Sequence, residues 1–330
     1  MPGPANSCPG RGNEVKANGQ TKPLAPAPSG PTLGVVAISH NEERDLVGFL
    51  ENLLPWVDEI VIIDDGSTDR TVELARAAGS KVRLMIAPRQ AGEYYSHQRN
   101  KGIAAAQSDW LLHMDVDERV TPALAAEIRE AIQDPAKDGY RFRRLNFFLH
   151  RPMRGGGWQN WNLVHLARRD KFRFGGKMHE SCHLDASADR VGQLRGLMWH
   201  LNDDGYLERL RKSYGYCQVE AENILERGQR VCWHHLLWPP LRLFLKRYLF
   251  QWGFRDGLPG LIAALSAAGA TLRSYALVWD AQNQLSRQEL EREVRRQWPA
   301  GAKPAAGLPA EPAPAQSAPG PELLIRPTSL

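Results

Sequence analysis

Short apolar runs alternate with amphipathic segments along residues 33–135. Runs of Val, Ile and Leu bounded by turn residues predict buried strands, and apolar residues recurring every three or four positions predict helices. The predicted strands are Leu33–Ile38, Glu59–Ile63, Val82–Ile86 and Trp110–Met114. The predicted helices are Glu42–Leu54, Thr71–Ala78, Tyr94–Ala106 and a helix that begins after Thr121. Strands and helices in this order predict an α/β fold with a mostly parallel sheet flanked by helices.

Capping residues mark where several of these helices begin. Asn41 is the candidate N-cap of the first helix, and Ser67 or Thr68 can start the second. Thr121 is the candidate N-cap of the last helix, which has Pro122 at its first position.

The remaining chain divides by composition. Residues 140–200 are rich in Arg, Trp, Phe and Gly, residues 203–227 are helical in pattern, and residues 233–282 are apolar, aromatic and basic together. Both ends are rich in Pro, Ala and Gly, which predicts disorder. We predict four segments: a disordered tail 1–31, an α/β domain 32–202, a C-terminal helical subdomain 203–298 and a disordered tail 299–330.

Composition places the chain in the cytoplasm. It has 330 residues, 42% of them hydrophobic, and a net charge of +5 that by itself does not indicate a nucleic-acid partner. None of its four cysteines lies at CxxC spacing, which predicts neither a zinc site nor a disulfide framework and suits a reducing compartment. The first 30 residues lack the apolar core of a signal peptide.

Acidic motifs follow two of the predicted strands. Asp64 and Asp65 precede Gly66 at the end of the second strand, where a carboxylate can accept hydrogen bonds from a base and a ribose. Asp115 and Asp117 follow the fourth strand, and residues i and i+2 of an extended stretch face the same way. Such a pair can bind Mg²⁺ or Mn²⁺ beside diphosphate oxygens. The simpler interpretation of either motif alone is a solvated turn next to a helix cap.

Together with Ala37–Glu42 on the first strand, these motifs resemble family 2 glycosyltransferases of the GT-A fold. The resemblance covers about residues 33–282 and is strongest to the bacterial branch that includes lipopolysaccharide-core glucosyltransferases. Further segments that resemble this branch are Gln98-Arg99-Asn100, Gly155-Gly156-Gly157-Trp158, Leu245–Tyr248 and Gly253–Gly257. The resemblance implies an inverting, metal-dependent transfer of a sugar, expected to come from a UDP-hexose, to a cell-envelope glycan such as lipopolysaccharide core.

The resemblance also implies roles for individual residues. The residues expected to contact the donor are Asn41, Glu42, Asp65, Gln98, Arg99 and Asp115. Asp115 and Asp117 would bind the Mg²⁺ or Mn²⁺ ion with His200 as a further ligand, although a histidine after an apolar run is often structural. The loop Gly155–Gly157 would lie near the donor sugar.

Two departures from the usual family pattern affect the catalytic base. The Glu-Asp pair of the usual base motif is missing, and so is the Gln-x-x-Arg-Trp motif, which argues against a processive synthase. We predict that Glu180, next to His179, takes the acceptor proton, with Asp117 as the second catalytic residue. A basic set in the same region suits phosphate on the donor or on the acceptor, or an ordinary solvated surface. It consists of Arg143, Arg144, Arg151, Arg154, Arg168 and Arg169.

Aromatic and basic side chains alternate through residues 233–254, where Pro239-Pro240 is expected to start a helix. This pattern predicts an interfacial helix on an anionic membrane surface. It would place the protein on the inner face of the cell membrane, near a lipid-linked glycan acceptor. The apolar stretch 258–272 is too short to span a bilayer. A soluble helical subdomain is the alternative.

Three other functions fit less well. A sugar-1-phosphate nucleotidyltransferase requires a Gly-rich, Arg-containing loop after the first strand, where this chain has Ser39–Glu42. An aspartyl phosphatase requires Asp-x-Asp-Gly-Thr after the first strand, whereas Asp64-Asp65-Gly66 follows the second. A third alternative is a membrane-bound scaffold that has lost catalysis, because the usual motif for the catalytic base is missing. The acidic motifs argue against this alternative.

Overall fold

The computed structural model describes residues 30–176, 181–202 and 205–298. Its strands are β1 (Leu33–Ser39), β2 (Glu59–Asp64), β3 (Val82–Ile86), β4 (Trp110–His113), β5 (Glu118–Val120), β6 (Gly139–Phe148), β7 (Arg151–Pro152), β8 (Asn162–Arg168), β9 (Phe172–Gly175), β10 (Ser181–Leu184) and β11 (Val191–His200). Its α-helices are α1 (Glu43–Leu53), α2 (Thr71–Ala77), α3 (Tyr95–Ala105), α4 (Pro122–Ala131), α5 (Tyr206–Glu226), α6 (Trp233–Leu245), α7 (Gly257–Asn283) and α8 (Arg287–Arg296).

The main sheet has the order β3-β2-β1-β4-β8-β6-β11-β5, with β7 paired to β6. The half formed by β3, β2, β1 and β4 is parallel, while β8 joins β4 and β6 in antiparallel register. β9 and β10 form a separate two-stranded sheet. The predicted α/β fold is confirmed, and its parallel character belongs mainly to the strands that carry the acidic motifs.

The core lies between the sheet and its helices because the central strands are apolar on both faces. Leu33, Val35, Ile60, Ile62 and Leu112 are all fully buried. The predicted apolar face of α1 packs into the same cluster. A strand buried on both faces reads as a continuous apolar run, which is why the sequence located these strands to within a residue or two.

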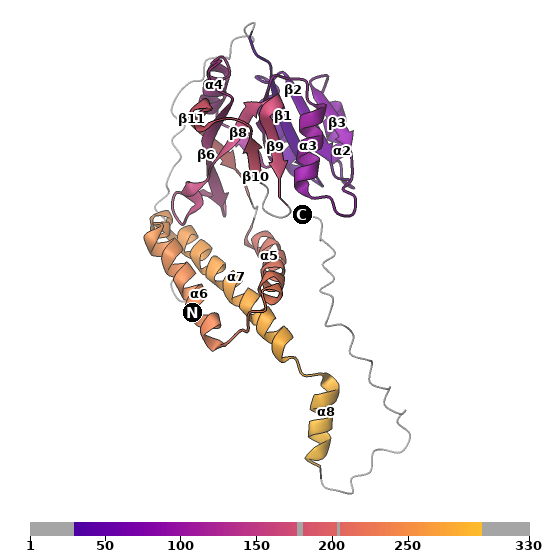
Figure 1. The fold of residues 1–330 in the computed structure, drawn as a ribbon, viewed down its shortest axis with the longest axis vertical. Coiled ribbons are helices and arrows are strands. Elements are labelled where there is room, and N and C mark those ends of the chain that lie inside the picture. The colour runs from indigo at the N-terminus through magenta and orange to yellow at the C-terminus, as the bar shows by residue number, and fades with distance from the viewer. Residues whose placement is uncertain (1–29, 177–180, 203–204, 299–330) are drawn as a thin grey trace, which may run out of the picture.

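A layer of three helices follows the sheet. α7 packs against both α5 and α6, and the three lie together below the sheet, with α8 extending away from them (Figure 1). α7, with the short turn before it, forms a helical segment Gly253–Asn283 that is long and apolar enough to cross a membrane by length and composition, although such a helix can equally be the core of a soluble protein. The helix that contains the apolar stretch 258–272 is longer than the sequence indicated, because it continues to Asn283.

Two predicted helix caps are wrong for identifiable reasons, and one is confirmed. Asn41 does not cap α1, because its backbone is left-handed (φ +57°) and its amide oxygen accepts the Thr68 N–H at 2.8 Å. Neither Ser67 nor Thr68 caps α2, which begins at Thr71 as predicted and whose first N–H donates to the Asp69 carboxylate at 2.9 Å. Thr121 does cap α4, with its hydroxyl accepting the Leu124 N–H.

The pair Pro239-Pro240 does not start a helix but lies inside α6. α6 begins at Trp233, where Cys232 and His235 cap each other's backbone N–H groups. Proline lacks an N–H and usually ends a helix. Here the chain stays helical and continues into a wider π-helical turn, Lys246–Phe250.

Candidate active site

The parallel strands β1, β2, β3 and β4 all end at one edge of the sheet, and the loops that follow them gather the acidic motifs there. Ligands of open α/β sheets bind outside this carboxyl edge. The sequence places Asp64 and Asp65 at the end of β2, and Asp115 directly after β4. We therefore expect the active site at this edge of the sheet.

Asp64 builds the loop rather than a binding surface. Its carboxylate is fully buried and accepts the N–H groups of Gly66 and Ser67, together with the hydroxyls of Ser39 and Ser67. All of its acceptor capacity is used within the protein. Asp64 thus holds β1, β2 and the Gly66 turn in register and turns the next residue, Asp65, toward the edge.

Asp65 is held by a cation and an amide from two other elements. Arg89 donates to it twice, from its backbone N–H and its Nε, both at 2.6 Å, and Gln98 Nε2 donates at 3.2 Å. The guanidinium of Arg89 also lies over the Tyr95 ring at 4.0 Å. This arrangement fixes a charged, hydrogen-bonding group with an aromatic face beside it, which suits a nucleoside.

Three consecutive residues of α3 each contact a different part of the site. Gln98 reaches Asp65, Arg99 Nη2 donates to Asp115 Oδ1 at 2.9 Å, and Asn100 exchanges two hydrogen bonds of 2.9 Å with the backbone of Phe174. α3 therefore ties β2, β4 and β9 together. The segment Gln98-Arg99-Asn100, which the family resemblance singled out, is a structural hub of the site.

Asp115 and Asp117 lie in a tight turn, not on the extended stretch that the sequence predicted. The Glu118 N–H donates to the Asp115 carbonyl at 3.0 Å, and the Asp115 N–H donates back to the Glu118 carboxylate at 2.9 Å. The reciprocal bonds reverse the chain after β4 so that β5 can start at Glu118. The i and i+2 argument, which assumes an extended backbone, does not apply here.

Asp117 faces a histidine from a distant strand. His200 Nε2 lies 3.0 Å from Asp117 Oδ2, and its other ring nitrogen lies 2.9 Å from Asn146 Oδ1. β5 and β11 pair directly, which brings His200 opposite Glu118. A carboxylate and an imidazole held this way, with the histidine oriented by a side-chain amide, are a donor set that suits a divalent metal.

Burial and like charges raise the pKa of two nearby carboxyl groups. Burial and then the charge of Asp117 raise the pKa of Glu42 to about 7. Burial and then the charge of Asp115 raise the pKa of Glu118 to about 7, against the Arg144 guanidinium 2.9 Å away. Burial would also raise the pKa of Asp115, but Arg99 and His113 lower it well below its ordinary value. The turn therefore concentrates negative charge, only part of which its arginines balance.

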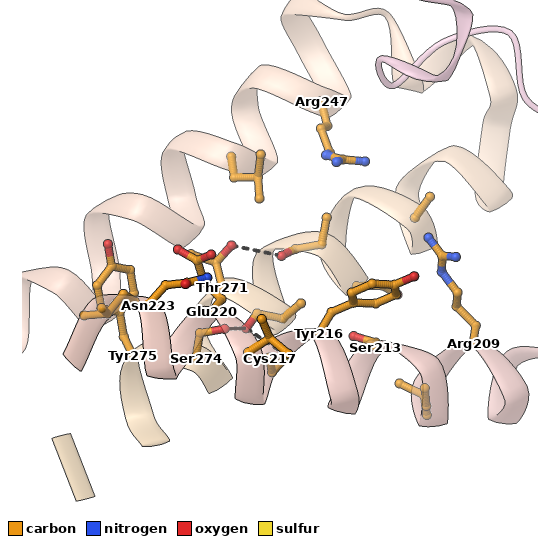
Figure 2. A pocket seen from close by; sticks show the side chains of 18 of the residues that line it. Arg209, Ser213, Tyr216, Cys217, Glu220, Asn223, Arg247, Thr271, Ser274 and Tyr275 are labelled. Carbon is orange, nitrogen blue, oxygen red and sulfur yellow. Dashed lines mark hydrogen bonds between the residues drawn. The ribbon is translucent and has the colours of Figure 1, made fainter. Parts of the chain in front are cut away.

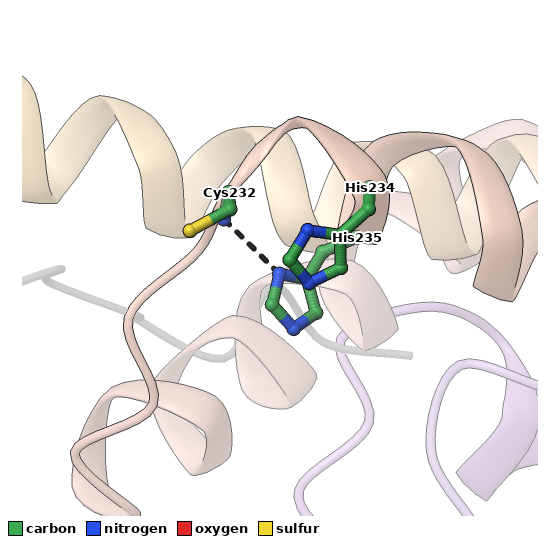
Figure 3. A group of neighbouring side chains, drawn as sticks. All are labelled: Cys232, His234 and His235. Carbon is green, nitrogen blue, oxygen red and sulfur yellow. Dashed lines mark hydrogen bonds between the residues drawn. The ribbon is translucent and has the colours of Figure 1, made fainter.

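A second group of potential metal ligands lies in the helical layer (Figure 3). Cys232, His234 and His235 are, within the ranges that the structure describes, the one set of three ligands whose donor atoms all lie within 4.8 Å of one another. Sulfur and imidazole ligands favour Zn²⁺ or Cu⁺ rather than Mg²⁺ or Mn²⁺. This group sits at the start of α6, so it does not replace the site at Asp117.

Comparison with known proteins assigns the family. The family model described as Glycosyl transferase family 2 matches residues 34–187. A lipopolysaccharide core biosynthesis glycosyltransferase, LpsC, of Rhizobium meliloti is 30% identical over 250 residues, which cover 72% of this chain and 87% of that protein. The chain belongs to glycosyl transferase family 2.

Other relatives of this family 2 glycosyltransferase are more distant. An uncharacterised glycosyltransferase of Rickettsia typhi is 23% identical over 246 residues, covering 69% of this chain and 82% of the relative. Glucosyl-3-phosphoglycerate synthase from Mycobacterium tuberculosis, solved with Mn²⁺, UDP and glucosyl-3-phosphoglycerate, is 18% identical. That match covers 61% of this chain and 82% of the synthase, with a TM-score of 0.40.

The structure groups the predicted site residues of the glycosyltransferase into neighbouring pairs. Asp65 meets Gln98, Asp115 meets Arg99, and Asp117 meets His200. Glu42 lies within electrostatic range of Asp117, and Asn41 packs on the loop after β2. The predicted base Glu180, with His179, lies outside the described residues.

The sequence reasoning missed three residues that complete these pairs. Arg89 follows β3, so it could have been found as the loop residue at the third parallel strand end. Glu118 stands three residues after Asp115, the spacing at which a turn brings two side chains together. Asn146 lies opposite His200 in the β6–β11 register and had no local signal at all.

Proposed function

We propose that this family 2 glycosyltransferase performs an inverting transfer of a hexose from UDP-hexose to a lipopolysaccharide-core type of acceptor. The observation that carries the proposal is the pairing of Asp117 with His200 at the carboxyl edge, directly after Asp115. These oxygen and nitrogen donors fit Mg²⁺ or Mn²⁺, and when bound the cation would stabilise the departing diphosphate. Asp65, held by Arg89 and Gln98, would bind the nucleoside, and Arg99 would sit beside the diphosphate.

The proposed acceptor rests on the relative from Rhizobium meliloti, which is named for lipopolysaccharide core biosynthesis. We propose that residues 32–202 form the catalytic domain and residues 203–298 a helical subdomain that rests on the inner face of the membrane. Support comes from large apolar side chains that are half exposed or more in the helical layer. They include Trp233, Leu237, Trp238, Phe250, Trp252 and Leu258. Exposed apolar patches of this kind mark interaction surfaces.

The first experiment measures donor use and metal dependence. The wild-type protein, a panel of radiolabelled nucleotide sugars and a membrane extract should give Mg²⁺- or Mn²⁺-dependent transfer. Asp117→Ala should lose metal-dependent UDP binding in calorimetry, while Asp170→Ala, which removes an exposed acid away from the carboxyl edge, should keep it. Neither transfer nor donor hydrolysis by the wild type would favour a catalytically inactive scaffold.

The catalytic base is tested separately. We propose Glu180 as the group that takes the acceptor proton, because the chemistry requires a base and the usual family motif for it is missing. Glu180→Gln should preserve UDP binding while turnover falls by about 10²-fold or more. Wild-type turnover in this variant would exclude Glu180 as the base.

Membrane association is tested by co-sedimentation. The protein should sediment with vesicles of anionic phosphatidylglycerol and less with phosphatidylcholine alone. Trp238→Ala should reduce sedimentation, whereas Trp298→Ala, an equally exposed tryptophan beyond α8, should not. Equal loss in both variants, or no binding by the wild type, would contradict the interfacial role of α6.

A further inference from the structure

A cavity of about 430 Å³ lies where the end of β6 meets the helical layer. The sheet contributes Arg144, the Gly-rich loop contributes Trp158, and the helical layer contributes Arg209, Lys246 and Arg247. A second cavity of about 450 Å³ adjoins it, because both are lined by Trp158, Arg209, Leu243 and Arg247. In Figure 2, Arg209 from α5 and Arg247 from the opposite helix both extend toward the same end of this second cavity.

The first cavity is strongly basic. Four cations line it, and none of the described residues that line it is acidic. Arg144 is paired with Glu118, whereas no carboxylate in the described part of the chain lies within salt-bridge distance of Lys246 or Arg247. Burial, together with the positive charge of Arg209, lowers the pKa of Arg247. Several cations gathered around one cavity favour an anionic ligand.

Two residues that line the cavity have buried hydrogen-bond donors. Among the described residues, Arg144 Nε and Trp158 Nε1 find no hydrogen-bond partner. Arg144 stacks on Trp161 at 4.2 Å and Arg209 on Trp158 at 5.5 Å, so two of the guanidiniums are held over aromatic rings. An arginine fixed in this way is preorganised for a planar or tetrahedral oxyanion.

The position of the cavity separates it from the residues proposed for the donor. Asn146, which lines it, also contacts His200, and His200 contacts Asp117. Asp65 follows β2 on the other half of the sheet, and Arg99 lies on α3, which packs on β1 and β2 of that half. The cavity therefore opens beside the reacting centre, on the side away from the nucleoside, where an acceptor has to enter.

We propose that this basic cavity binds an anionic group, phosphate or carboxylate, of the acceptor sugar and so sets acceptor specificity. The inference rests on the proposed glycosyl transfer and extends it by naming the acceptor class: a glycan that carries a negative charge close to the hydroxyl that is glycosylated. Arg247 and Lys246 are the recognition residues, and Asn146 links the cavity to His200.

The test crosses protein variants with chemically modified acceptors. The variants are Arg247→Gln, Arg247→Lys and the control Arg211→Gln, which removes the same charge from an exposed position on α5 outside both cavities. The acceptors are lipopolysaccharide with a truncated core, the same material stripped of phosphate, and the same material with its carboxyl groups reduced. Transfer kinetics, UDP binding and acceptor binding by calorimetry are measured for each pair.

We expect the wild type to have a KM about tenfold lower for the native acceptor than for one of the two neutralised acceptors, which identifies the anion. Arg247→Gln should lose this discrimination with UDP binding unchanged, Arg247→Lys should recover part of it, and Arg211→Gln should behave as wild type. Equal KM values for all acceptors, or wild-type discrimination in Arg247→Gln, overturn the inference. Weakened UDP binding in Arg247→Gln also overturns it, since the cations would then serve the donor.

The two proposals can fail separately. Transfer by the wild type without charge discrimination leaves the glycosyltransferase activity standing and removes the anionic subsite. If the wild type transfers sugar to no acceptor, calorimetry still measures acceptor binding directly. Tighter binding of native than of neutralised lipopolysaccharide, lost in Arg247→Gln, supports the subsite, and equal binding refutes it.

Discussion

The Gly-rich loop of this glycosyltransferase packs closely against the helical layer. Gly155→Ala should disrupt this contact. A Cβ atom at Gly155 would lie 2.2 Å from the Trp252 carbonyl oxygen and 2.6 Å from its carbon. Because both partners are backbone, no side-chain rotation can relieve the overlap. Gly155 does not have a positive φ, so alanine is allowed by its local conformation and any effect must come from this contact.

The magnitude follows from what must move. Ordinary contacts begin near 3.4 Å, so the loop and the Trp252 backbone must separate by about 1 Å. Three hydrogen bonds from backbone N–H groups of residues 154–156 cross this boundary: those of Arg154 and Gly155 donate to Asp256 at 2.9 and 2.7 Å, and that of Gly156 donates to the Gln251 carbonyl at 2.8 Å. Bonds to a charged group contribute about 1.5–3 kcal/mol each. Partial loss of the set, with overpacking, should lower the free energy of unfolding by about 2–4 kcal/mol.

Urea unfolding of Gly155→Ala and Gly215→Ala supplies the assay. Gly215 lies within α5 with nothing near its missing Cβ, so alanine there should leave stability unchanged or raise it by about 0.5–1 kcal/mol. Since the loop lines the basic cavity, Gly155→Ala should also raise the acceptor KM more than it weakens UDP binding. If Gly155→Ala unfolds at the wild-type urea concentration, the close approach of loop and helical layer is not real.

Two further predictions address charge. Asp65→Asn should weaken UDP binding about tenfold in calorimetry, because it removes the charge that Arg89 and Gln98 hold in place. The control Asp109→Asn, at the opposite end of β4, should leave UDP binding unchanged. Equal UDP affinities of the two variants would exclude Asp65 from the nucleoside site. Asp138 is buried beside Arg190, which lowers the pKa of its carboxyl well below the ordinary 3.8, with Lys171 adding to the effect. Asp138→Asn should cost about 1–3 kcal/mol of unfolding free energy at pH 7. Because a lowered carboxyl pKa stabilises the fold above the unfolded-state value, this cost should shrink as pH falls below about 4; a cost that stays constant with pH would contradict the ion pair.

The strands and helices of the first 135 residues were predictable because local pattern and burial agree there. The strand ends carrying Asp65 and Asp115 followed from the same pattern, since parallel strands place their carboxyl ends at one edge. Predictions failed where a neighbouring segment overrules the local preference. Asn41 is a good cap by residue type, but the Thr68 N–H from the next loop takes its side chain. Pro240 is a poor residue for a helix interior, yet α6 runs through it.

The site was predictable in its residue types but not in its pairings. Asp117 and His200 are 83 positions apart, and only the antiparallel pairing of β5 with β11 brings them together. Arg99 and Asp115 meet because α3 packs on β1, the neighbour of β4 in the sheet. Sequence periodicity predicts neither strand register nor which helix packs on which strand. The metal-binding pair Asp115 and Asp117 could therefore be proposed from a motif, whereas the residues that contact them could not.

The contacts of the Gly-rich loop connect the helical layer to the candidate active site. Asp256 and Gln251, from the helical layer, bind the backbone of residues 154–156, and Arg247 lies in the cavity that this loop completes. The loop lies between β7 and β8, and both of these strands pair with β6. Asn146 is on β6, and its side chain contacts His200. The loop in turn contacts Asn146, whose side-chain amide donates to the Trp158 carbonyl and whose own carbonyl accepts the Met153 N–H. These contacts connect the helical layer to His200, because the Asn146 side chain also contacts the His200 ring.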